Sequence, residues 1–181
     1  MTSENTNRHS TRWSVVTGAP CSGKTAVIHK LEQRGYKVVH EVARAYIDSE
    51  LLMGKTLPEI KADEWAFERH ILMEKVRIES TLKKDEIIFF DRGVPDSIAY
   101  YKLNGLDSAE PFQKSGEVHY QNVFLFERIR FLTDPVRSEN EKTALQLGRL
   151  IQESYQALGY DLIHVPLLSV EARTEFILER L

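Results

Sequence analysis

An octapeptide near the N-terminus, GAPCSGKT at residues 18–25, limits how this chain can fold more than any other feature. It matches the pattern G-x-x-x-x-G-K-[ST], follows the apolar run Trp13–Val16 and precedes a stretch with helical spacing. In this setting the glycines permit backbone angles that other residues avoid, and successive N–H groups form a nest for an anion at a helix N-terminus. The sequence therefore predicts a strand, a phosphate-binding loop and a helix in succession.

We expect the whole loop to contact the phosphates of a bound nucleotide. Lys24 would supply a positive charge to the β- and γ-phosphates, and the hydroxyl of Thr25 would bind Mg²⁺. Cys21 lies at an unrestricted position, where it is either a small loop residue or a redox-sensitive thiol near a helix N-terminus. The residues expected to hold the nucleotide are Gly18, Ala19, Pro20, Cys21, Ser22, Gly23, Lys24 and Thr25.

Apolar runs suited to buried strands recur along the chain and alternate with stretches of helical spacing. This alternation predicts parallel β-α-β units and an α/β fold, in which three layers (α/β/α) are built around a five-stranded parallel sheet. The expected strands are 14–17, 37–40, 87–91, 122–126 and 162–165. The expected helices are 25–34, 41–52, 59–83, 95–103, 140–158 and 169–181, with a loop and a short helix at 106–116.

The composition excludes several classes of protein. The 181 residues, 42% of them hydrophobic, suit one domain with a sizeable core, and a net charge of −3 gives no reason to expect nucleic acid as a partner. No apolar run approaches the roughly 18 residues of a membrane span, and the polar N-terminus does not resemble a secretory signal. A single cysteine fits a reducing compartment. We therefore expect a disordered tail over residues 1–11, one domain over residues 12–181 and a cytoplasmic location.

A second group of polar residues, Asp91 and Arg92, directly follows the apolar run 87–90. A carboxylate at the carboxyl end of a buried parallel strand points into the ligand crevice. Asp91 is therefore expected to supply a second Mg²⁺ contact beside Thr25, although a solvated turn residue would give the same pattern. Arg92 is expected to fork onto a phosphate or carboxylate of a second substrate.

Glu41 follows the second expected strand, so it should face the same crevice. There it could accept a proton from the hydroxyl group of an acceptor, or hold that hydroxyl. Arg44 lies one helical turn further on, on the same face. The pattern is equally typical of a glutamate that opens a helix, favours its dipole and pairs with Arg44, and both interpretations stay open.

Arginines are concentrated after the fourth expected strand, where Arg128, Arg130 and Arg137 lie on either side of Asp134-Pro135. We expect a mobile flap that brings Arg130 and Arg137 to the phosphates, where charge accumulates during phosphoryl transfer. A solvated loop held by salt bridges is the alternative.

Taken together, these stretches resemble the NadR-like AAA-type ATPase family, P-loop NTPases named after a nicotinamide riboside kinase domain. The resemblance covers about residues 13–181 and is most specific in DRG-x-PD-x-x-AY at 91–100 and in Y-x-x-LGY…VP…SVE-x-R at 155–173. It implies a nucleoside-monophosphate-kinase-like fold that binds ATP or GTP with Mg²⁺. The positions that carry over are Lys24 and Thr25 (phosphate and metal), Asp91 (metal), Arg92 (acceptor), Glu41 (base), and Arg130 and Arg137 (lid).

Two functions are open at this point. The first is a Mg²⁺-dependent kinase that transfers the γ-phosphate to a hydroxyl of a nucleoside-like or related metabolite, held between Glu41, Arg44 and Arg92. The second is a regulatory protein that binds a nucleotide, hydrolyses it slowly and switches a protein or lipid partner. Groups on the acceptor side of the crevice favour the kinase, because a switch has no need of them.

Overall fold

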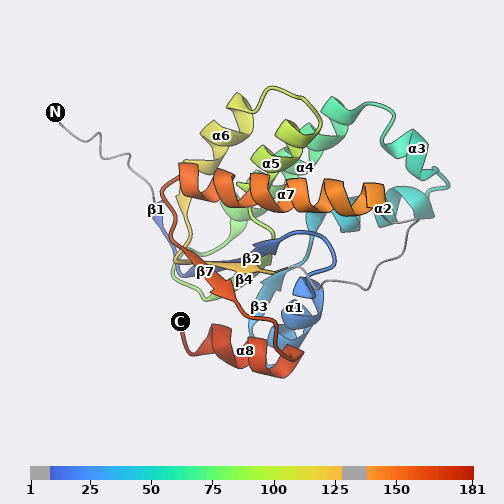
Figure 1. Cartoon of the computed structure of the whole chain (residues 1–181). Coiled ribbons are helices and arrows are strands. Elements are labelled where there is room, and N and C mark those ends of the chain that lie inside the picture. Colours follow the sequence, from blue (N-terminus) through green and yellow to red (C-terminus); the bar gives the residue numbers. More distant parts are fainter. Residues whose placement is uncertain (1–8, 128–137) are drawn as a thin grey trace.

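The computed structural model describes residues 9–127 and 138–181, and the statements below refer to these residues. Five parallel strands form the central sheet in the order β3-β4-β2-β6-β7 (Figure 1). Their bounds are β2 Trp13–Gly18, β3 Lys37–Val39, β4 Ile88–Asp91, β6 Asn122–Phe126 and β7 Leu162–Val165. The predicted fold class is confirmed, and every strand begins and ends within one residue of its expected position.

Helices cover both faces of this sheet (Figure 1). On one face lie α1 (Lys24–Gln33) and α8 (Val170–Leu178), and on the other lie α5 (Asp96–Leu103) and α7 (Ser138–Ala157). Successive strand residues point to opposite faces, so neighbours such as Val15 and Val16 belong to different apolar clusters. Both of these valines are completely buried, which is why the strands read as continuous apolar runs.

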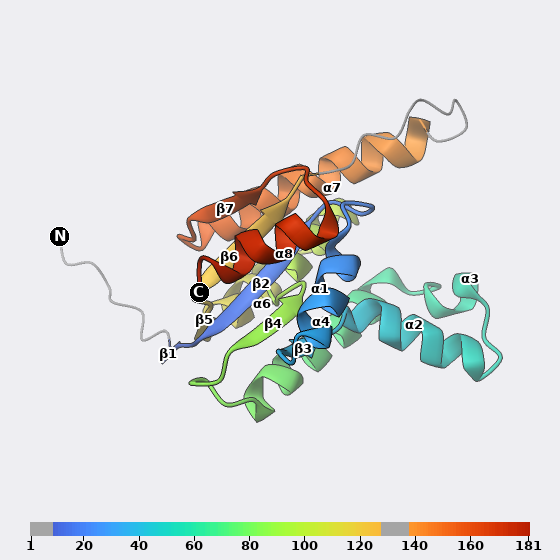
Figure 2. The same cartoon turned by 90° about the horizontal axis from the view of Figure 1, so that it is seen from below.

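A group of helices beside the sheet consists of α2 (Val42–Leu52), α3 (Leu57–Ile60) and α4 (Glu64–Thr81). They share an apolar cluster of their own, and α2 and α3 extend away from the sheet (Figure 2). The single helix predicted over 59–83 is wrong, because the chain turns between α3 and α4. Asp63 caps a new helix there by accepting a hydrogen bond from the backbone N–H of Ala66 at 2.9 Å.

The first described residues are part of the folded structure. Strand β1 (His9–Ser10) pairs in parallel with β5 (Val118–His119), and the hydroxyl of Thr11 donates to the carbonyl of His119 at 3.0 Å. The disordered tail predicted over 1–11 is therefore corrected for residues 9–11, while residues 1–8 lie outside the described part. The expected short helix of segment 106–116 is α6 (Ala109–Ser115). None of the described helices has the length and hydrophobicity that a membrane span requires.

Candidate functional site

The loop at residues 18–25 joins the central strand β2 to helix α1. Gly18 has φ 132° and Gly23 has φ 83°, a region that glycine enters without strain. A Cβ atom at Gly18 would collide with the carbonyl oxygen of Phe126 in the neighbouring strand β6. Gly23 is the N-cap of α1, and no side chain caps the first turn. The N–H groups at this end of α1 are thus free of side-chain acceptors, an arrangement that attracts an anion.

Lys24 lies inside this loop and is only 5% exposed. Its Nζ donates to the carbonyl oxygen of Ala19 at 2.8 Å and to Oγ of Ser22 at 3.0 Å. Burial, and then the charge of Arg92, lower the pKa of Lys24 to about 7. Both hydrogen-bond acceptors are neutral, so an arriving phosphate would favour the charged form of this lysine.

We expect nucleotide binding to be coupled to proton uptake. Above pH 7 the free protein holds Lys24 largely neutral, and a bound phosphate should restore its proton, with uptake approaching about one proton near pH 8. At pH 6 the lysine is already charged, so this uptake should be much smaller. Calorimetric titration with ATP·Mg²⁺ in buffers of different ionisation enthalpy measures the number of protons.

The matched control is Lys24→Arg, because arginine keeps its charge across this pH range. If this variant still binds the nucleotide, the proton uptake on binding at pH 8 should disappear. Binding heats of the unchanged protein that do not depend on the buffer at pH 8 would contradict the coupling.

Thr25 and Asp91 come together at the carboxyl ends of β2 and β4. The Oγ1 atom of Thr25 donates to Oδ2 of Asp91 at 3.0 Å, while Oδ1 of Asp91 has no hydrogen-bond partner among the described residues. Asp91 is 1% exposed, which excludes the solvated turn residue, and burial followed by the charge of Glu41 raises its pKa. A buried carboxylate oxygen without a partner, next to a hydroxyl, fits the oxygen ligands that Mg²⁺ prefers.

Arg92 connects the loop to Glu41. It has φ 71°, and its Nη1 donates to the carbonyl oxygen of Gly18 at 3.1 Å and to Oδ1 of Asp96 at 3.2 Å. Its Nε lies 3.4 Å from Oε1 of Glu41, so Glu41 pairs with Arg92 rather than with Arg44. The local ion pair between Glu41 and Arg44, one of the two interpretations from the sequence, is therefore not what the structure forms.

Asp96, at the start of α5, fixes the turn that carries Arg92. It is completely buried and accepts hydrogen bonds from the hydroxyls of Thr17 at 2.5 Å and Tyr155 at 2.7 Å, and from the backbone N–H of Gly93 at 2.9 Å. Burial opposes its ionisation, but the charge of Arg92 contributes to a pKa below the usual range. A charged Asp96 therefore holds the guanidinium of Arg92 beside the phosphate-binding loop.

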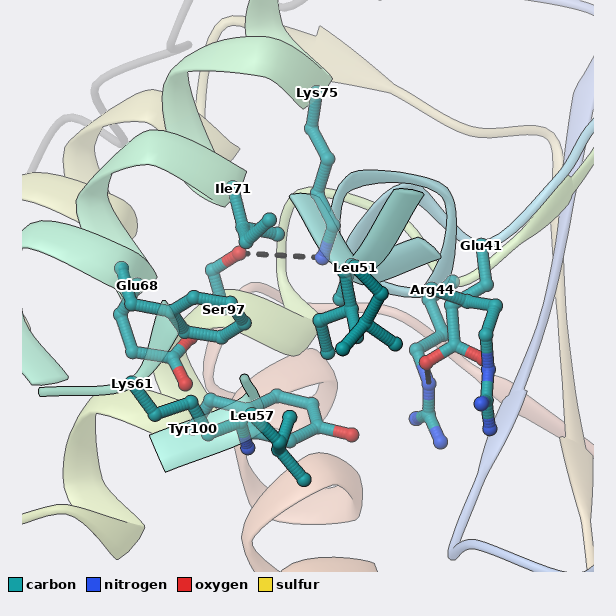
Figure 3. A pocket seen from close by; sticks show the side chains of 14 residues that line it. Glu41, Arg44, Leu51, Leu57, Lys61, Glu68, Ile71, Lys75, Ser97 and Tyr100 are labelled. Atoms are coloured by element: carbon teal, nitrogen blue, oxygen red, sulfur yellow. Dashed lines mark hydrogen bonds and ion pairs between the residues drawn. The ribbon is translucent and has the colours of Figure 1, made fainter. Parts of the chain in front are cut away.

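A cavity of about 350 Å³ opens next to Arg92, between α2, α3, α4 and α5 (Figure 3). Glu41 and Arg44 lie close together on one side of it, and Lys61, Glu68 and Tyr100 lie on the other. Much of the remaining wall is apolar, from Ala43, Ile47, Leu51, Leu57, Phe67 and Ile71. The three residues expected on the acceptor side, Glu41, Arg44 and Arg92, thus line a single pocket.

Two charged residues of α4 in this pocket were not predicted from the sequence. Lys75 donates from Nζ to the carbonyl oxygen of Gly93 at 3.0 Å. It also donates to Oγ of Ser97 at 3.2 Å (Figure 3). Burial lowers the pKa of Lys75, and it raises the pKa of Glu68 to about 7. A signal was present, since both share a helix face with the buried Ile71, where charged side chains are rare without a partner.

A third residue without a predicted role, Arg173 of α8, bonds to the phosphate-binding loop. Its Nη1 donates to the carbonyl oxygen of Ser22 at 2.8 Å and its Nε donates to that of Leu168 at 2.7 Å. The lid arginines Arg130 and Arg137 lie outside the described residues. Their role stays a prediction.

The chain matches one protein family in sequence and resembles kinases in fold. A family model described as an AAA domain matches residues 13–173. A structure of NadR in complex with NR is 16% identical with a TM-score of 0.68, and the match covers 96% of this chain but only 51% of that one. The chain therefore spans about half the length of this NadR chain.

Two further structures match over nearly their whole length. Deoxyadenosine kinase from M. mycoides is 17% identical with a TM-score of 0.63, and the match covers 92% of this chain and 96% of that one. Thymidylate kinase from Ehrlichia chaffeensis is 12% identical with a TM-score of 0.65, over 94% and 98%. At sequence identities this low, the match shows that the chain shares the fold of these kinases and no more. None of the curated proteins compared with the sequence matches it significantly.

Proposed function

Because the chain belongs to the AAA domain family and has the fold of nucleoside and nucleotide kinases, we propose that it is a Mg²⁺-dependent small-molecule kinase. It would transfer the γ-phosphate of ATP, or of GTP, to a hydroxyl of a nucleoside-like or related metabolite. One observation carries the proposal: a pocket lined by Glu41 and Arg92 opens beside the phosphate-binding loop, and Arg92 bonds to that loop directly. A protein that only bound and hydrolysed a nucleotide would not need this second pocket.

The residues present supply what phosphoryl transfer requires, which is positioning and charge. Lys24 and the N–H groups of the loop would bind the phosphates. Thr25 and Asp91 would hold Mg²⁺, which neutralises charge on the β- and γ-phosphates when bound. Glu41 would take the proton from the acceptor hydroxyl, with Arg92 holding its carboxylate toward the loop. Arg130 and Arg137 would add positive charge from the lid.

The charges around the pocket favour an acceptor that carries an anionic group. Four basic side chains line it, against two acidic ones. Lys75 and Arg92 already bond to the protein, whereas Arg44 and Lys61 are exposed at its wall. One carboxyl, Glu68, has a pKa raised by burial to about 7 and so carries only part of a charge at neutral pH.

The test is an ADP-release assay with ATP·Mg²⁺ and a panel of acceptors. The panel should pair each nucleoside, including nicotinamide riboside, with its monophosphate, because such pairs differ only in the anionic group. Strong stimulation by one compound identifies a kinase and its acceptor class. Slow release that no compound stimulates would count against the kinase.

Replacing Glu41 with Gln is expected to lower kcat about 100-fold or more, because a general base typically contributes 10²- to 10⁴-fold. The KM for ATP should change little, since the contacts of Lys24 and Thr25 remain. Steady-state kinetics with the stimulating acceptor measures both constants. Glu153→Gln, at an exposed position of α7, is the matched control and should behave as wild type. Transfer at the wild-type rate in Glu41→Gln would show that Glu41 is not the base.

A second function, a regulatory NTPase that switches a protein or lipid partner, is favoured by one observation. Leu52 and Met53, at the end of α2, are 90% and 69% exposed. They directly follow Leu51, which lines the pocket, and exposed apolar side chains are a surface that a partner could cover. Unstimulated, slow hydrolysis in the assay above would direct the search to such a partner.

A further inference from the structure

Two histidines and a glutamate come together on the surface beside the sheet edge. His29 and Glu32 lie one turn apart on α1, and His40 follows strand β3. Nδ1 of His29 lies 3.5 Å from one oxygen of Glu32, and Nε2 of His40 lies 3.3 Å from the other. We propose that these three side chains bind a divalent transition-metal ion, for which Zn²⁺ is the natural probe.

The arrangement meets the requirements of a zinc site. Two imidazoles and one carboxylate are a common set of Zn²⁺ ligands, and a fourth position is usually left for water. Ligand atoms about 2.0–2.1 Å from a tetrahedral ion lie about 3.3 Å apart. Each imidazole nitrogen is at a similar distance from its own oxygen of Glu32, at 3.3 Å for His40 and 3.5 Å for His29. Possible ligand atoms of all three residues lie within 4.8 Å of one another. All three side chains are exposed, so each can rotate toward a shared ion.

This site differs in chemistry from the one formed by Thr25 and Asp91. That pair offers only oxygen atoms, which suit Mg²⁺, whereas imidazole nitrogen favours zinc and its neighbours among the transition metals. Within residues 9–127 and 138–181, no other set of three histidine, cysteine or acidic residues meets the same distance criterion. The two sites can therefore be loaded with different ions.

An ion at this site would connect two segments that carry residues of the candidate functional site. Helix α1 begins with Lys24 and Thr25, and His40 directly precedes Glu41. An ion held by His29, Glu32 and His40 would tie the helix of the phosphate-binding loop to the segment that carries Glu41. It would fix that wall of the acceptor pocket relative to the loop.

The test is calorimetric titration of Zn²⁺ into the untagged, full-length protein in the presence of excess Mg²⁺. We expect one Zn²⁺ per chain at this site. His29→Ala and His40→Ala should each weaken binding at least tenfold, because even groups behind a metal ligand change affinity about 10- to 100-fold. Two controls should keep the wild-type affinity: His164→Ala, an exposed histidine of β7, and Asp91→Asn, at the oxygen site.

Thermal unfolding gives a second readout that needs no nucleotide. Zn²⁺ should raise the Tm of wild type and of His164→Ala, but not that of His40→Ala, because an ion stabilises only a fold that binds it. Equal affinity in wild type and His40→Ala, or an equal loss in His164→Ala, would overturn the proposal. Neither result depends on phosphoryl transfer, so this proposal and the kinase proposal fail separately.

Discussion

Lys24→Ala is expected to lower kcat/KM for ATP turnover at least about 100-fold, the scale seen when one group that stabilises transition-state charge is removed. Lys24 is buried in the loop, where its Nζ bonds to Ala19 and Ser22. In loops of the pattern G-x-x-x-x-G-K-[ST] the lysine reaches the β- and γ-phosphates. The alanine leaves that charge unreplaced in a site that water enters poorly. ADP release measures the loss of turnover, and the binding of a fluorescent ATP analogue measures the loss of affinity.

The control for this change is Lys30→Ala on the same helix. Lys30 pairs at 2.9 Å with Glu171 at the protein surface, and an ion pair exposed to solvent contributes little to stability. Its turnover should match wild type. The Lys24 variant should remain folded, because the side chain that it removes bonds only to the neutral acceptors Ala19 and Ser22, and far-UV circular dichroism checks this. Full turnover in folded Lys24→Ala would mean that the nucleotide binds elsewhere.

The sheet could be predicted from the sequence because its strands are buried on both faces. Residues 87–90 read as a continuous apolar run before Asp91, and β4 is Ile88–Asp91. The helices beside the sheet were harder to predict. Helical spacing continues from Glu59 to Lys83, so it hides the turn before α4. Only the cap formed by Asp63 decides that a new helix begins there.

Some residues of the candidate site could likewise be predicted from the sequence, and others could not. Thr25 ends the loop after β2, Glu41 comes shortly after β3, and Asp91 is the last residue of β4. The carboxyl ends of parallel strands meet at one edge of a sheet. Their neighbourhood could therefore be inferred from the sequence alone. Glu68 and Lys75 reach the pocket only because α4 packs against α5, a tertiary contact that leaves no local pattern beyond charges on a buried helix face.

Asp96 is held by tertiary contacts of this kind, and we expect its replacement to have a large effect on stability. Asp96→Ala is expected to lower the free energy of unfolding by about 3–5 kcal/mol, because it leaves the buried guanidinium of Arg92 without its buried carboxylate partner. The hydroxyls of Thr17 and Tyr155 lose their acceptor at the same time. Urea unfolding measures the change, and for a chain of this size the Tm should fall by roughly 10 °C. Asp85→Ala, an exposed aspartate, should stay within about 0.5 kcal/mol of wild type.

A second substitution tests whether the loss arises from this network. Tyr155→Phe alone should cost about 1 kcal/mol, the usual net contribution of one hydrogen bond. In the Asp96→Ala background the same change should cost much less, because the acceptor of the Tyr155 hydroxyl is already gone. Strict additivity of the two changes would show that Asp96 acts through some other contact. Non-additive losses, together with reduced transfer in Asp96→Asn at unchanged ATP affinity, would identify Asp96 as the residue that positions Arg92.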